Sequence, residues 1–236
     1  MTVIVLQARL DSSRLPRKAL LPLDGKPLVF HVMEALSRIP AALRILACPE
    51  DSADTFKALA ASAGFEVFAG SKYDVLGRFC AAIRHFGLAS EGGCRIVRAT
   101  GDNPFVFCDA AEAINGEAAA LDADYAGFAG LPYGAGVESV AVSALLRAEK
   151  EAETQYHREH VCPYLYENGG IFTLHRPLAP AKWRYPSMRL TVDTADDYGT
   201  AELLYRELLR NAPPEECVPG EAIIGAYNRI FPPPPR

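Results

Sequence analysis

The chain opens with a short apolar run and continues with segments that alternate between strand and helix patterns. Residues 2–6 are apolar and rich in β-branched side chains, which suits a buried strand of a parallel sheet. Short strands are also expected over 43–47 and 66–69, and apolar positions recur at helical spacing over 27–37 and 51–63. This alternation predicts a parallel sheet with helices on its faces.

The second half of the chain continues with helices and strands in a less regular order. Helices are expected over 75–87, 110–120, 143–153, 194–210 and 221–230, with Ser143 capping the third of them. Strands are expected over 94–99, 171–174 and 190–192, and a short extended segment with a turn at Asp24–Gly25 precedes the first helix. An exposed proline-rich tail is expected over 232–235.

The composition excludes several classes of protein. A chain of 236 residues, half of them hydrophobic, can bury a sizeable core, and a net charge of −5 disfavours a general nucleic-acid binder. No apolar run approaches the roughly 20 residues that span a bilayer. The six cysteines lack metal-site spacing and suit buried positions in a reducing compartment. We therefore expect a cytoplasmic protein with neither nucleic acid nor membrane as a partner.

The polar loop that follows the first predicted strand is the first candidate for chemistry. Residues 7–18 carry four cations, two hydroxyls and Pro16. A loop at the carboxyl end of a first strand is where open α/β sheets bind ligands, and Arg and Lys side chains with hydroxyls suit a polyphosphate. Pro16 stiffens the loop. On composition alone, a solvated basic surface explains the loop equally well.

The order of the residues in this loop carries a family resemblance. Gln-Ala-Arg-x-x-Ser-x-Arg-Leu-Pro-x-Lys-x-Leu resembles the opening motif of the cytidylyltransferases that activate Kdo and acylneuraminic acids, most of all the spore-coat polysaccharide biosynthesis branch. In that family the loop grips the triphosphate of CTP. The resemblance therefore implies a nucleotide-binding role for Gln7, Ala8, Arg9, Leu10, Ser12, Ser13, Arg14 and Lys18.

A second stretch of the resemblance follows the third predicted strand. Ser-x-x-Asp-Val-Leu-x-Arg over 71–78 is similar to the same branch, in which this region meets the nucleotide. The resemblance makes Ser71 and Arg78 neighbours of the site. By spacing alone, Asp74 and Arg78 stand one helical turn apart and also suit a surface ion pair.

Two aspartates are candidates for a magnesium site. Asp102 follows the strand over 94–99 and precedes Pro104, and Asp193 stands at a strand-to-helix junction. Mg²⁺ prefers carboxylate oxygens and keeps phosphate oxygens as further ligands. Each aspartate also suits a turn or a helix N-terminus, and Thr194 with Asp197 resembles a capping box.

The resemblance favours the metal interpretation of both aspartates. Gly-Asp-x-Pro is the family's metal-binding segment, and the aspartate of Val-Asp-Thr completes its metal site. Thr100, just ahead of this segment, is expected at the nucleotide. Asn103 replaces an acidic residue of the Kdo enzymes, so their second carboxylate is missing at this position.

The middle of the chain supplies candidates for the acceptor pocket. Gly-x-x-Val-Glu over 134–138 resembles the family's segment near the acceptor, and Arg-Glu-His-Val-x-Pro-Tyr-x-Tyr over 158–166 matches the spore-coat branch. The candidates for contact with the acceptor are Tyr133, Glu138, Arg158, His160 and Arg189. Glu138 suits equally a structural role beside an arginine, and residues 158–160 suit a dimer partner. Zinc at His157 and His160 is disfavoured, because further ligands at sensible spacing are scarce.

The resemblance extends over residues 2 to about 200, and it implies a fold, a reaction, a cofactor and a set of site residues. The implied fold is a three-layer α/β/α arrangement with a mostly parallel, mixed sheet, Rossmann-like and similar to nucleotide-diphospho-sugar transferases. The implied reaction transfers CMP from CTP to an acidic sugar and releases pyrophosphate, with Mg²⁺ as cofactor. Arg9, Lys18 and Asp102 would be catalytic, and Asp102 and Asp193 would hold the metal. The family also implies a homodimer.

The resemblance also implies a division of one domain, 1–236, into three parts. Residues 1–127 would form a nucleotide-binding half, 128–190 an acceptor and dimer region, and 191–236 a metal-site strand with the C-terminal helices.

Three other functions are compatible with the sequence. The enzyme could use another acceptor, such as a polyol phosphate or a phosphonate. A glycosyltransferase would bind metal at Asp122 and Asp124, but these residues precede a strand predicted to begin at Tyr125, whereas ligands favour the carboxyl ends of strands. A regulatory protein that binds a nucleotide without turnover is the third, and Asn103 is the departure from the family pattern that favours it.

Overall fold

A central mixed sheet of seven strands organises the computed structural model, which describes residues 1–211 and 218–232. The strands lie in the order β5 (Glu66–Gly70), β4 (Leu43–Pro49), β1 (Thr2–Gln7), β6 (Arg95–Thr100), β8 (Glu138–Ala141), β7 (Tyr125–Ala126) and β9 (Leu174–His175). Strand β8 runs antiparallel to both of its neighbours, and the other neighbouring pairs are parallel. The prediction of a mostly parallel, mixed sheet is confirmed.

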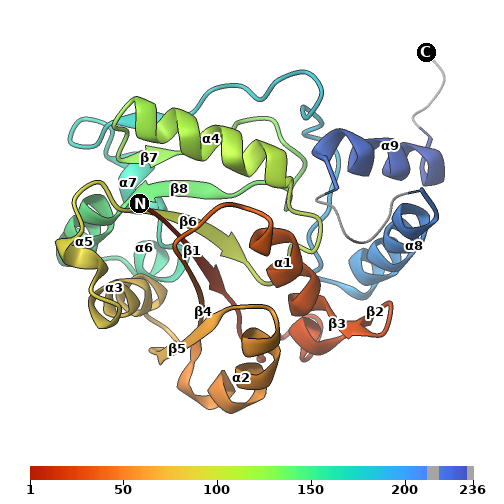
Figure 1. Ribbon diagram of the computed structural model, residues 1–236, viewed down its shortest axis with the longest axis horizontal. Coiled ribbons are helices and arrows are strands. Elements are labelled where there is room, and N and C mark those ends of the chain that lie inside the picture. Colours follow the sequence, from red (N-terminus) through yellow and green to blue (C-terminus); the bar gives the residue numbers. More distant parts are fainter. Residues whose placement is uncertain (212–217, 233–236) are drawn as a thin grey trace.

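Helices cover both faces of this sheet and complete three layers (Figure 1). One face carries α1 (Leu28–Ser37), α2 (Ala53–Ser62), α4 (Cys108–Ala120), α8 (Ala195–Asn211) and α9 (Gly220–Ile230). The other carries α3 (Val75–His85), α5 (Val142–Glu151), α6 (Gln155–His160) and α7 (Pro163–Glu167). Side chains alternate between the faces along β1, so Ile4 and Leu6 enter one core and Val3 and Val5 enter the other.

The order of the connections reverses at β1, and this places the site. From β1 the chain passes outward to β4 and β5, and then returns to pair β6 with the opposite edge of β1. A crevice therefore opens at the carboxyl ends of β1 and β6, which is where open α/β sheets bind ligands. The loop over 7–18 and the turn over 100–104 border this crevice.

Two predicted strands differ from the structure. Residues 190–192 are extended but join no strand, because their backbone bonds to loops: Leu190 N–H donates to the Tyr133 carbonyl and Val192 N–H to the Asp102 carbonyl, both at 2.8 Å. The strand expected over 171–174 is confirmed only at its end, in β9, because Ile171 N–H closes a turn onto Asn168.

The hydrophobic pattern did not predict strand β8 or the correct N-cap of α5. Strand β8 was not among the predicted strands, since it contains only four residues and follows a glycine-rich loop. The chain then passes directly from β8 into α5, so the N-cap of α5 is Ala141 and the expected cap at Ser143 is wrong. The capping box at the start of α8 is confirmed: Asp197 N–H donates to Thr194 Oγ1 at 3.2 Å, and Asp197 Oδ2 accepts from the N–H of Thr194 at 3.0 Å.

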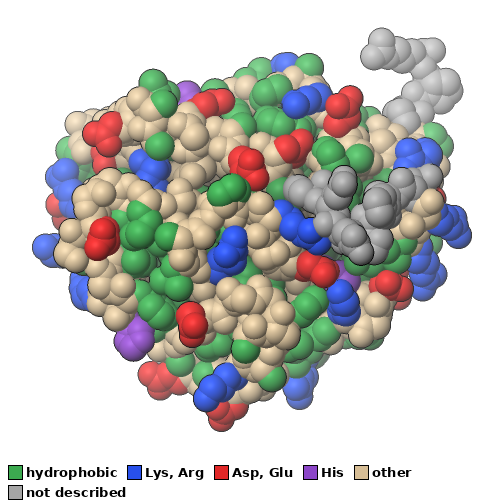
Figure 2. Space-filling model, in the orientation of Figure 1, with side chains coloured by type: hydrophobic (Ala, Val, Ile, Leu, Met, Phe, Trp, Pro, Cys, Tyr) green, Lys and Arg blue, Asp and Glu red, His purple; other side chains and the backbone are tan. Residues whose placement is uncertain are grey.

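The surface mixes the two signs of charge. On the face drawn in Figure 2, basic and acidic side chains alternate with apolar ones, in keeping with a net charge of −5. Among the residues that the structure describes, no helix combines the length and the apolar character needed to cross a bilayer. The tail expected over 232–235 lies, from 233 on, outside the described residues.

Candidate active site

A cavity of about 450 Å³ fills the crevice at the carboxyl ends of β1 and β6. Its walls come from the loops after β1, β5 and β6, from the start of α3 and the end of α6, and from the segments that carry Tyr133 and Asp193. The lining residues are Gln7, Ala8, Arg9, Ser12, Ser13, Arg14, Lys18, Ala19, Lys72, Val75, Arg78, Arg98, Thr100, Gly101, Asp102, Asn103, Tyr133, Gly134, Glu159, His160, Thr191 and Asp193. We call it the main cavity.

The loop after β1 is held so that its polar side faces the main cavity. Leu10 and Leu15 pack against the hydrophobic core, whereas Arg9 and Arg14 line the cavity. The resemblance placed Leu10 among the nucleotide contacts. In the structure Leu10 instead packs against the core and holds the loop in place, and it does not line the main cavity. The loop ends in a 3-10 turn, Lys18–Leu20, which turns Lys18 inward.

Lys18 connects the two candidate metal ligands. Its Nζ donates to Asp102 Oδ2 at 2.7 Å and to Asp193 Oδ1 at 2.8 Å. The three side chains come from the loop after β1, the turn after β6 and the start of α8, so residues far apart in sequence meet at one point. The Asp102 carbonyl also accepts a bond from Val192 N–H at 2.8 Å, which fixes the neighbouring Asp193 although residues 190–192 form no strand.

Asp193 is the most heavily paired carboxylate of the site. Besides Lys18, it contacts Arg14 Nη2 at 3.0 Å and Arg189 Nη2 at 2.8 Å. Burial opposes the charged form, but the hydrogen bonds and charges of Lys18, Arg189 and Arg14 outweigh it and hold the pKa of Asp193 below its ordinary value. Asp193 is therefore ionised at neutral pH although it is buried.

Arg78 is a buried cation of the main cavity without a carboxylate partner in the described part of the chain. Its side chain is 3% exposed, Nη1 donates to the Ser71 carbonyl at 2.6 Å, and Nε has no partner. Burial, with the nearby charge of Arg9, lowers the pKa of Arg78 to about 10. It still carries a charge at neutral pH, and a buried charge needs a counterion. An anionic ligand in the main cavity would provide one.

The surface pair considered for Asp74 and Arg78 does not form. Asp74 instead caps α3 by accepting from Gly77 N–H at 2.8 Å, and it forms an ion pair with Arg158. Arg158 also donates to the backbone carbonyl of Glu149 at 2.9 Å. Arg158 therefore joins α6 to α3 and α5. It lines neither the main cavity nor the second cavity described next.

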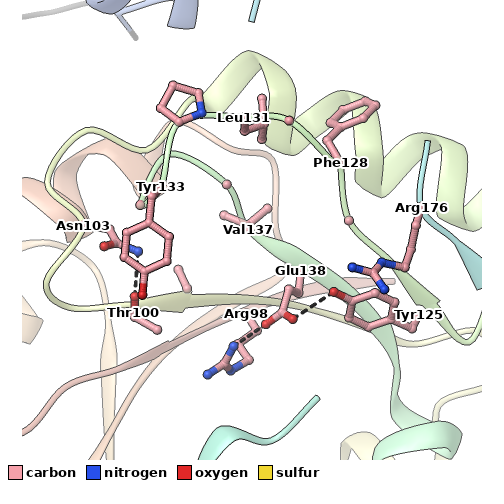
Figure 3. A pocket seen from close by; sticks show the side chains of 16 residues that line it. Arg98, Thr100, Asn103, Tyr125, Phe128, Leu131, Tyr133, Val137, Glu138 and Arg176 are labelled. Carbon is pink, nitrogen blue, oxygen red and sulfur yellow. Dashed lines mark hydrogen bonds and ion pairs between the residues drawn. The ribbon is translucent and has the colours of Figure 1, made fainter. Parts of the chain in front are cut away.

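A second cavity of about 290 Å³ shares a wall with the main one, and we call it the side cavity (Figure 3). Its lining residues are Arg98, Ala99, Thr100, Asn103, Tyr125, Gly127, Phe128, Gly130, Leu131, Pro132, Tyr133, Gly134, Gly136, Val137, Glu138 and Arg176. The shared wall comprises Arg98, Thr100, Asn103, Tyr133 and Gly134. A ligand in the side cavity would therefore meet a ligand in the main cavity at the end of β6.

Glu138 lies in the side cavity and is already paired. It forms an ion pair with Arg98 and accepts from the Tyr125 hydroxyl at 2.9 Å (Figure 3). Arg98 Nη2 also donates to Gln7 Oε1 at 3.0 Å. The role of Glu138 as a partner of an arginine, left open by the sequence, is confirmed. Burial, followed by the negative charge of Glu138, raises the pKa of Tyr125, so its hydroxyl stays protonated as a donor.

The remaining acceptor candidates are divided between the cavities. Tyr133 lines both, and His160 lines the main cavity. Arg189 lines neither: it pairs with Asp193 and Asp197, and its guanidinium carbon lies 5.0 Å from the centroid of the Tyr133 ring. Arg189 thus holds Asp193 and Tyr133 in place without contacting the main or the side cavity itself.

Sequence reasoning missed several residues of the main cavity. Ser71 is absent from its lining, but the next residue, Lys72, lines it and pairs with Asp11 at 2.8 Å. Thr191 also lines it, although it lies in none of the motifs, and Glu159 lines it from within the motif over 158–166. Lys72 stands in the same resembling stretch as Ser71, so this motif gave a signal that was assigned one position too early.

The metal sites proposed for other functions find no support. Asp122 and Asp124 precede β7, which runs in the same direction as β6, so they lie at the amino end of a strand whereas the main cavity lies at the carboxyl ends. Asp124 Oδ2 accepts from Thr173 N–H at 2.9 Å. His157 pairs with Glu167 at 2.7 Å. Across residues 1–211 and 218–232, no group of three or more His, Cys, Asp or Glu side chains could hold a metal ion. A metal at Asp102 and Asp193 would thus need further ligands from the substrate or water.

Gly134 allows the wall between the cavities to pack against the segment that carries Asp193. Its φ is +94°, and a Cβ atom would lie 2.6 Å from the backbone nitrogen of Thr191. We expect Gly134→Ala to lower the free energy of unfolding by about 3 kcal/mol, because the strained φ and the backbone clash add. Urea unfolding measures the change. Gly92, whose Cβ would meet nothing within 4 Å, provides the control, and equal losses in Gly134→Ala and Gly92→Ala would contradict the packing argument.

Comparison with protein families identifies relatives along nearly the whole chain. A family model described as cytidylyltransferase matches residues 3–213. An uncharacterised protein of Methanocaldococcus jannaschii, MJ1063, is 34% identical over 211 residues, which cover 88% of this chain and 82% of that protein. The spore coat polysaccharide biosynthesis protein SpsF of Bacillus subtilis is 29% identical over 212 residues, covering 87% of this chain and 86% of SpsF.

Solved structures share the fold. A cytidylyltransferase from Leptospira borgpetersenii superimposes with a TM-score of 0.86 at 23% identity, covering 98% of this chain and 94% of that one. A CMP:2-keto-3-deoxy-manno-octonic acid synthetase solved with CTP superimposes with a TM-score of 0.65 at 16% identity, covering 87% and 98%. At these identities the likeness concerns the fold, and it confirms the expected Rossmann-like arrangement.

Proposed function

Because the chain belongs to the cytidylyltransferase family, we propose that it transfers CMP from CTP to a hydroxyl of an acidic sugar and releases pyrophosphate. One observation in the main cavity carries this proposal. Arg78 is a buried guanidinium that has no carboxylate partner among the described residues, and Arg9 lines the same cavity. A triphosphate would supply the negative charge that Arg78 lacks.

The reaction needs positioning and charge neutralisation more than covalent help. The acceptor oxygen forms a bond to the α-phosphorus, the bond from that phosphorus to the pyrophosphate oxygen breaks, and the hydroxyl proton leaves to solvent. Arg9, Arg14 and Lys18 line the cavity from the loop after β1 and would stabilise the charge that grows on pyrophosphate. Asp193 holds Arg14 and Lys18 at the site before the substrate arrives.

Cytidylyltransferases generally use a divalent metal ion, and Asp102 with Asp193 would hold Mg²⁺ here. One carboxylate oxygen of each already converges on a single cationic atom, Lys18 Nζ. This arrangement fits a hard cation, for which two carboxylates with phosphate oxygens and water are a common ligand set. When bound, the ion would neutralise charge on the phosphates. Asn103 is uncharged, so the protein offers two carboxylates rather than three.

The side cavity would hold the acceptor, next to the nucleotide. The side cavity has a volume of about 290 Å³ and the main cavity about 450 Å³. This order of sizes fits a single sugar in the side cavity and a larger nucleotide in the main cavity. Within its lining, Glu138 is neutralised by Arg98, which leaves Arg176 with a charge that no described carboxylate matches. An acidic acceptor would complete this charge balance. SpsF, a relative by sequence, is named for polysaccharide biosynthesis, and we propose the same setting for this reaction.

Replacing Arg176 tests the acidic character of the acceptor. We expect Arg176→Gln to raise KM for an acidic sugar about 30-fold and to leave KM for CTP unchanged, because a charge-assisted hydrogen bond contributes about 2 kcal/mol. The measurement is steady-state pyrophosphate release. Arg184→Gln is the matched control, since it removes the same charge outside both cavities. An Arg176 variant that binds the acid as well as the Arg184 variant would exclude this role.

Pyrophosphate release with CTP, UTP, GTP and ATP tests the function as a whole. Each nucleotide is supplied with Mg²⁺ and then with EDTA, together with acidic sugars that include 3-deoxy-manno-octulosonate and N-acetylneuraminate. We expect release with CTP alone, and its loss in EDTA. Release only with a polyol phosphate would keep the transfer and change the acceptor. A protein that binds none of the nucleotides would refute the proposal.

A further inference from the structure

The carboxylate of Glu159 lines the main cavity but takes no part in the candidate metal site. Asp102 and Asp193, the other carboxylates of the lining, both pair with Lys18. Glu159 is partly buried near the end of α6, and within residues 1–211 and 218–232 no cation pairs with it and no group donates a hydrogen bond to it. An ionised carboxylate only accepts hydrogen bonds, so Glu159 offers the cavity an unused acceptor.

The turn that ends α6 holds Glu159 at the wall of the cavity. Cys162 N–H donates to the His160 carbonyl at 2.9 Å and closes a turn around Val161, whose φ is +72° and whose ψ is −61°. This γ-turn is rare and strained, and a β-branched residue adopts it with particular difficulty. The Val161 side chain is fully buried, so its packing in the core keeps the turn in this shape. Such outliers cluster at binding and active sites.

Glu159 enters the cavity from the side opposite Asp193. Asp193 precedes α8 on one face of the sheet, whereas α6 covers the other face (Figure 1). The ion pair of Arg158 with Asp74 fastens α6 to the start of α3, where Val75 adds an apolar side chain to the wall. A nucleobase has a flat apolar face and polar atoms at its edge, so it fits this side of the cavity better than a phosphate does.

The chemistry of the nucleotide narrows the group that Glu159 binds. Phosphate oxygens are anionic and carry no hydrogen, so a carboxylate repels them. The donors of CTP are the ribose hydroxyls and the 4-amino group of cytosine, and the base is the part of the nucleotide farthest from the triphosphate. With the phosphates at Lys18 and Asp193, the base would be the part that reaches the α6 side. Uracil carries a carbonyl oxygen in place of the amino group, so the same carboxylate would repel UTP.

We propose that the Glu159 carboxylate accepts a hydrogen bond from the 4-amino group of cytosine and so selects CTP over UTP. This inference rests on the proposed function and deepens it by assigning a residue to the choice of base. Glutamate and aspartate recognise the same amino group of cytosine in the major groove of DNA. A site built around such a bond rejects an analogue that lacks the donor, because its own polar group is then left unpaired.

Binding of CTP and UTP to Glu159→Gln tests the assignment without a sugar, by calorimetry in Mg²⁺. Kd for CTP should rise about 30-fold, since a hydrogen bond to a charged group has an effect of this size. Kd for UTP should stay the same or fall, because the glutamine amide can donate to the uracil oxygen. Glu153→Gln is the matched control: Glu153 is exposed ahead of α6, outside both cavities, and its variant should keep the wild-type preference for CTP.

A CTP analogue with hydrogen in place of the 4-amino group identifies the partner of Glu159. Wild type should bind this analogue about 30-fold more weakly than CTP, because the hydrogen bond is lost. Glu159→Gln should bind the analogue about as well as it binds CTP, since the carboxylate and the amino group form one interaction.

The remaining outcomes separate this inference from the proposed function. A wild-type protein that prefers CTP, together with an unchanged preference in Glu159→Gln, would overturn the inference alone. An equal loss of affinity for CTP and UTP in Glu159→Gln would assign the carboxylate to the ribose hydroxyls and overturn it too. Wild-type protein that binds neither nucleotide would refute the proposed function, and the inference with it.

Discussion

Replacing Asp102 by asparagine is expected to lower kcat at least about 1000-fold, because the metal site loses half of its protein charge, and interactions worth several kcal/mol depend on it. Asparagine has the same shape and can still accept a hydrogen bond from Lys18. The Asp102 side chain is 27% exposed, so its ion pair contributes little to folding, and we expect the free energy of unfolding to change by about 1 kcal/mol or less. Pyrophosphate release and urea unfolding measure the two effects.

Asp122→Asn is the matched control for Asp102→Asn. Asp122 precedes β7, at the amino ends of the strands and away from the main cavity, and its φ of +48° is one that asparagine adopts readily. The control should keep wild-type kcat and stability. The reverse result, with Asp122→Asn inactive and Asp102→Asn active, would move the metal to the sequence motif of the glycosyltransferase alternative.

The parallel half of the fold could be predicted because its signals are local. Residues 2–6 form a buried strand for which apolar character suffices, and the helices of this half show regular spacing. The crevice at β1 and β6 follows from the order of these elements. The polar loop over 7–18 therefore could be placed at a ligand site from sequence.

The acceptor side could not be predicted in the same way, because its elements depend on tertiary contacts. Strands β7 and β9 contain two residues each, so the pattern indicated a strand near each of them but not its bounds. Arg176 follows β9 and carries no motif, yet the sheet brings it to the side cavity. Arg158 lies within a resembling motif, but it pairs with Asp74, which is 84 residues away in sequence. Spacing along the chain cannot distinguish these two arginines.

The candidate metal site shows a similar limit. Sequence and resemblance brought Asp102 and Asp193 together, and they assigned Lys18 to the triphosphate. In the structure Lys18 contacts both aspartates at once, so its ammonium occupies the position between the carboxylates that a metal ion would need. Lys18 and a divalent ion would therefore compete for the two carboxylates. A sequence pattern identifies these three residues, but it does not show that the lysine and a metal ion would bind the same carboxylates.

Lys18→Met is expected to separate these two arrangements. Without the ammonium, the carboxylates of Asp102 and Asp193 face each other, and a partly buried charge loses a partner. We expect the free energy of unfolding in EDTA to fall by about 2 kcal/mol, less than for a fully buried pair because Arg14 and Arg189 still neutralise Asp193. Activity should fall about 1000-fold, since a cation beside the leaving pyrophosphate is lost.

The response to Mg²⁺ without nucleotide distinguishes this explanation from a general loss of stability. Binding to the folded state raises the unfolding temperature, so Mg²⁺ should raise that of Lys18→Met more than that of wild type, because no ammonium competes for the two carboxylates. Lys26→Met is the control: Lys26 pairs with Glu34 at 3.1 Å on the surface, and its loss should change stability by about 0.5 kcal/mol or less and leave the Mg²⁺ response at the wild-type level. Equal Mg²⁺ responses in wild type and Lys18→Met would mean that Lys18 does not exclude a metal ion, and that Asp102 and Asp193 serve to position the lysine.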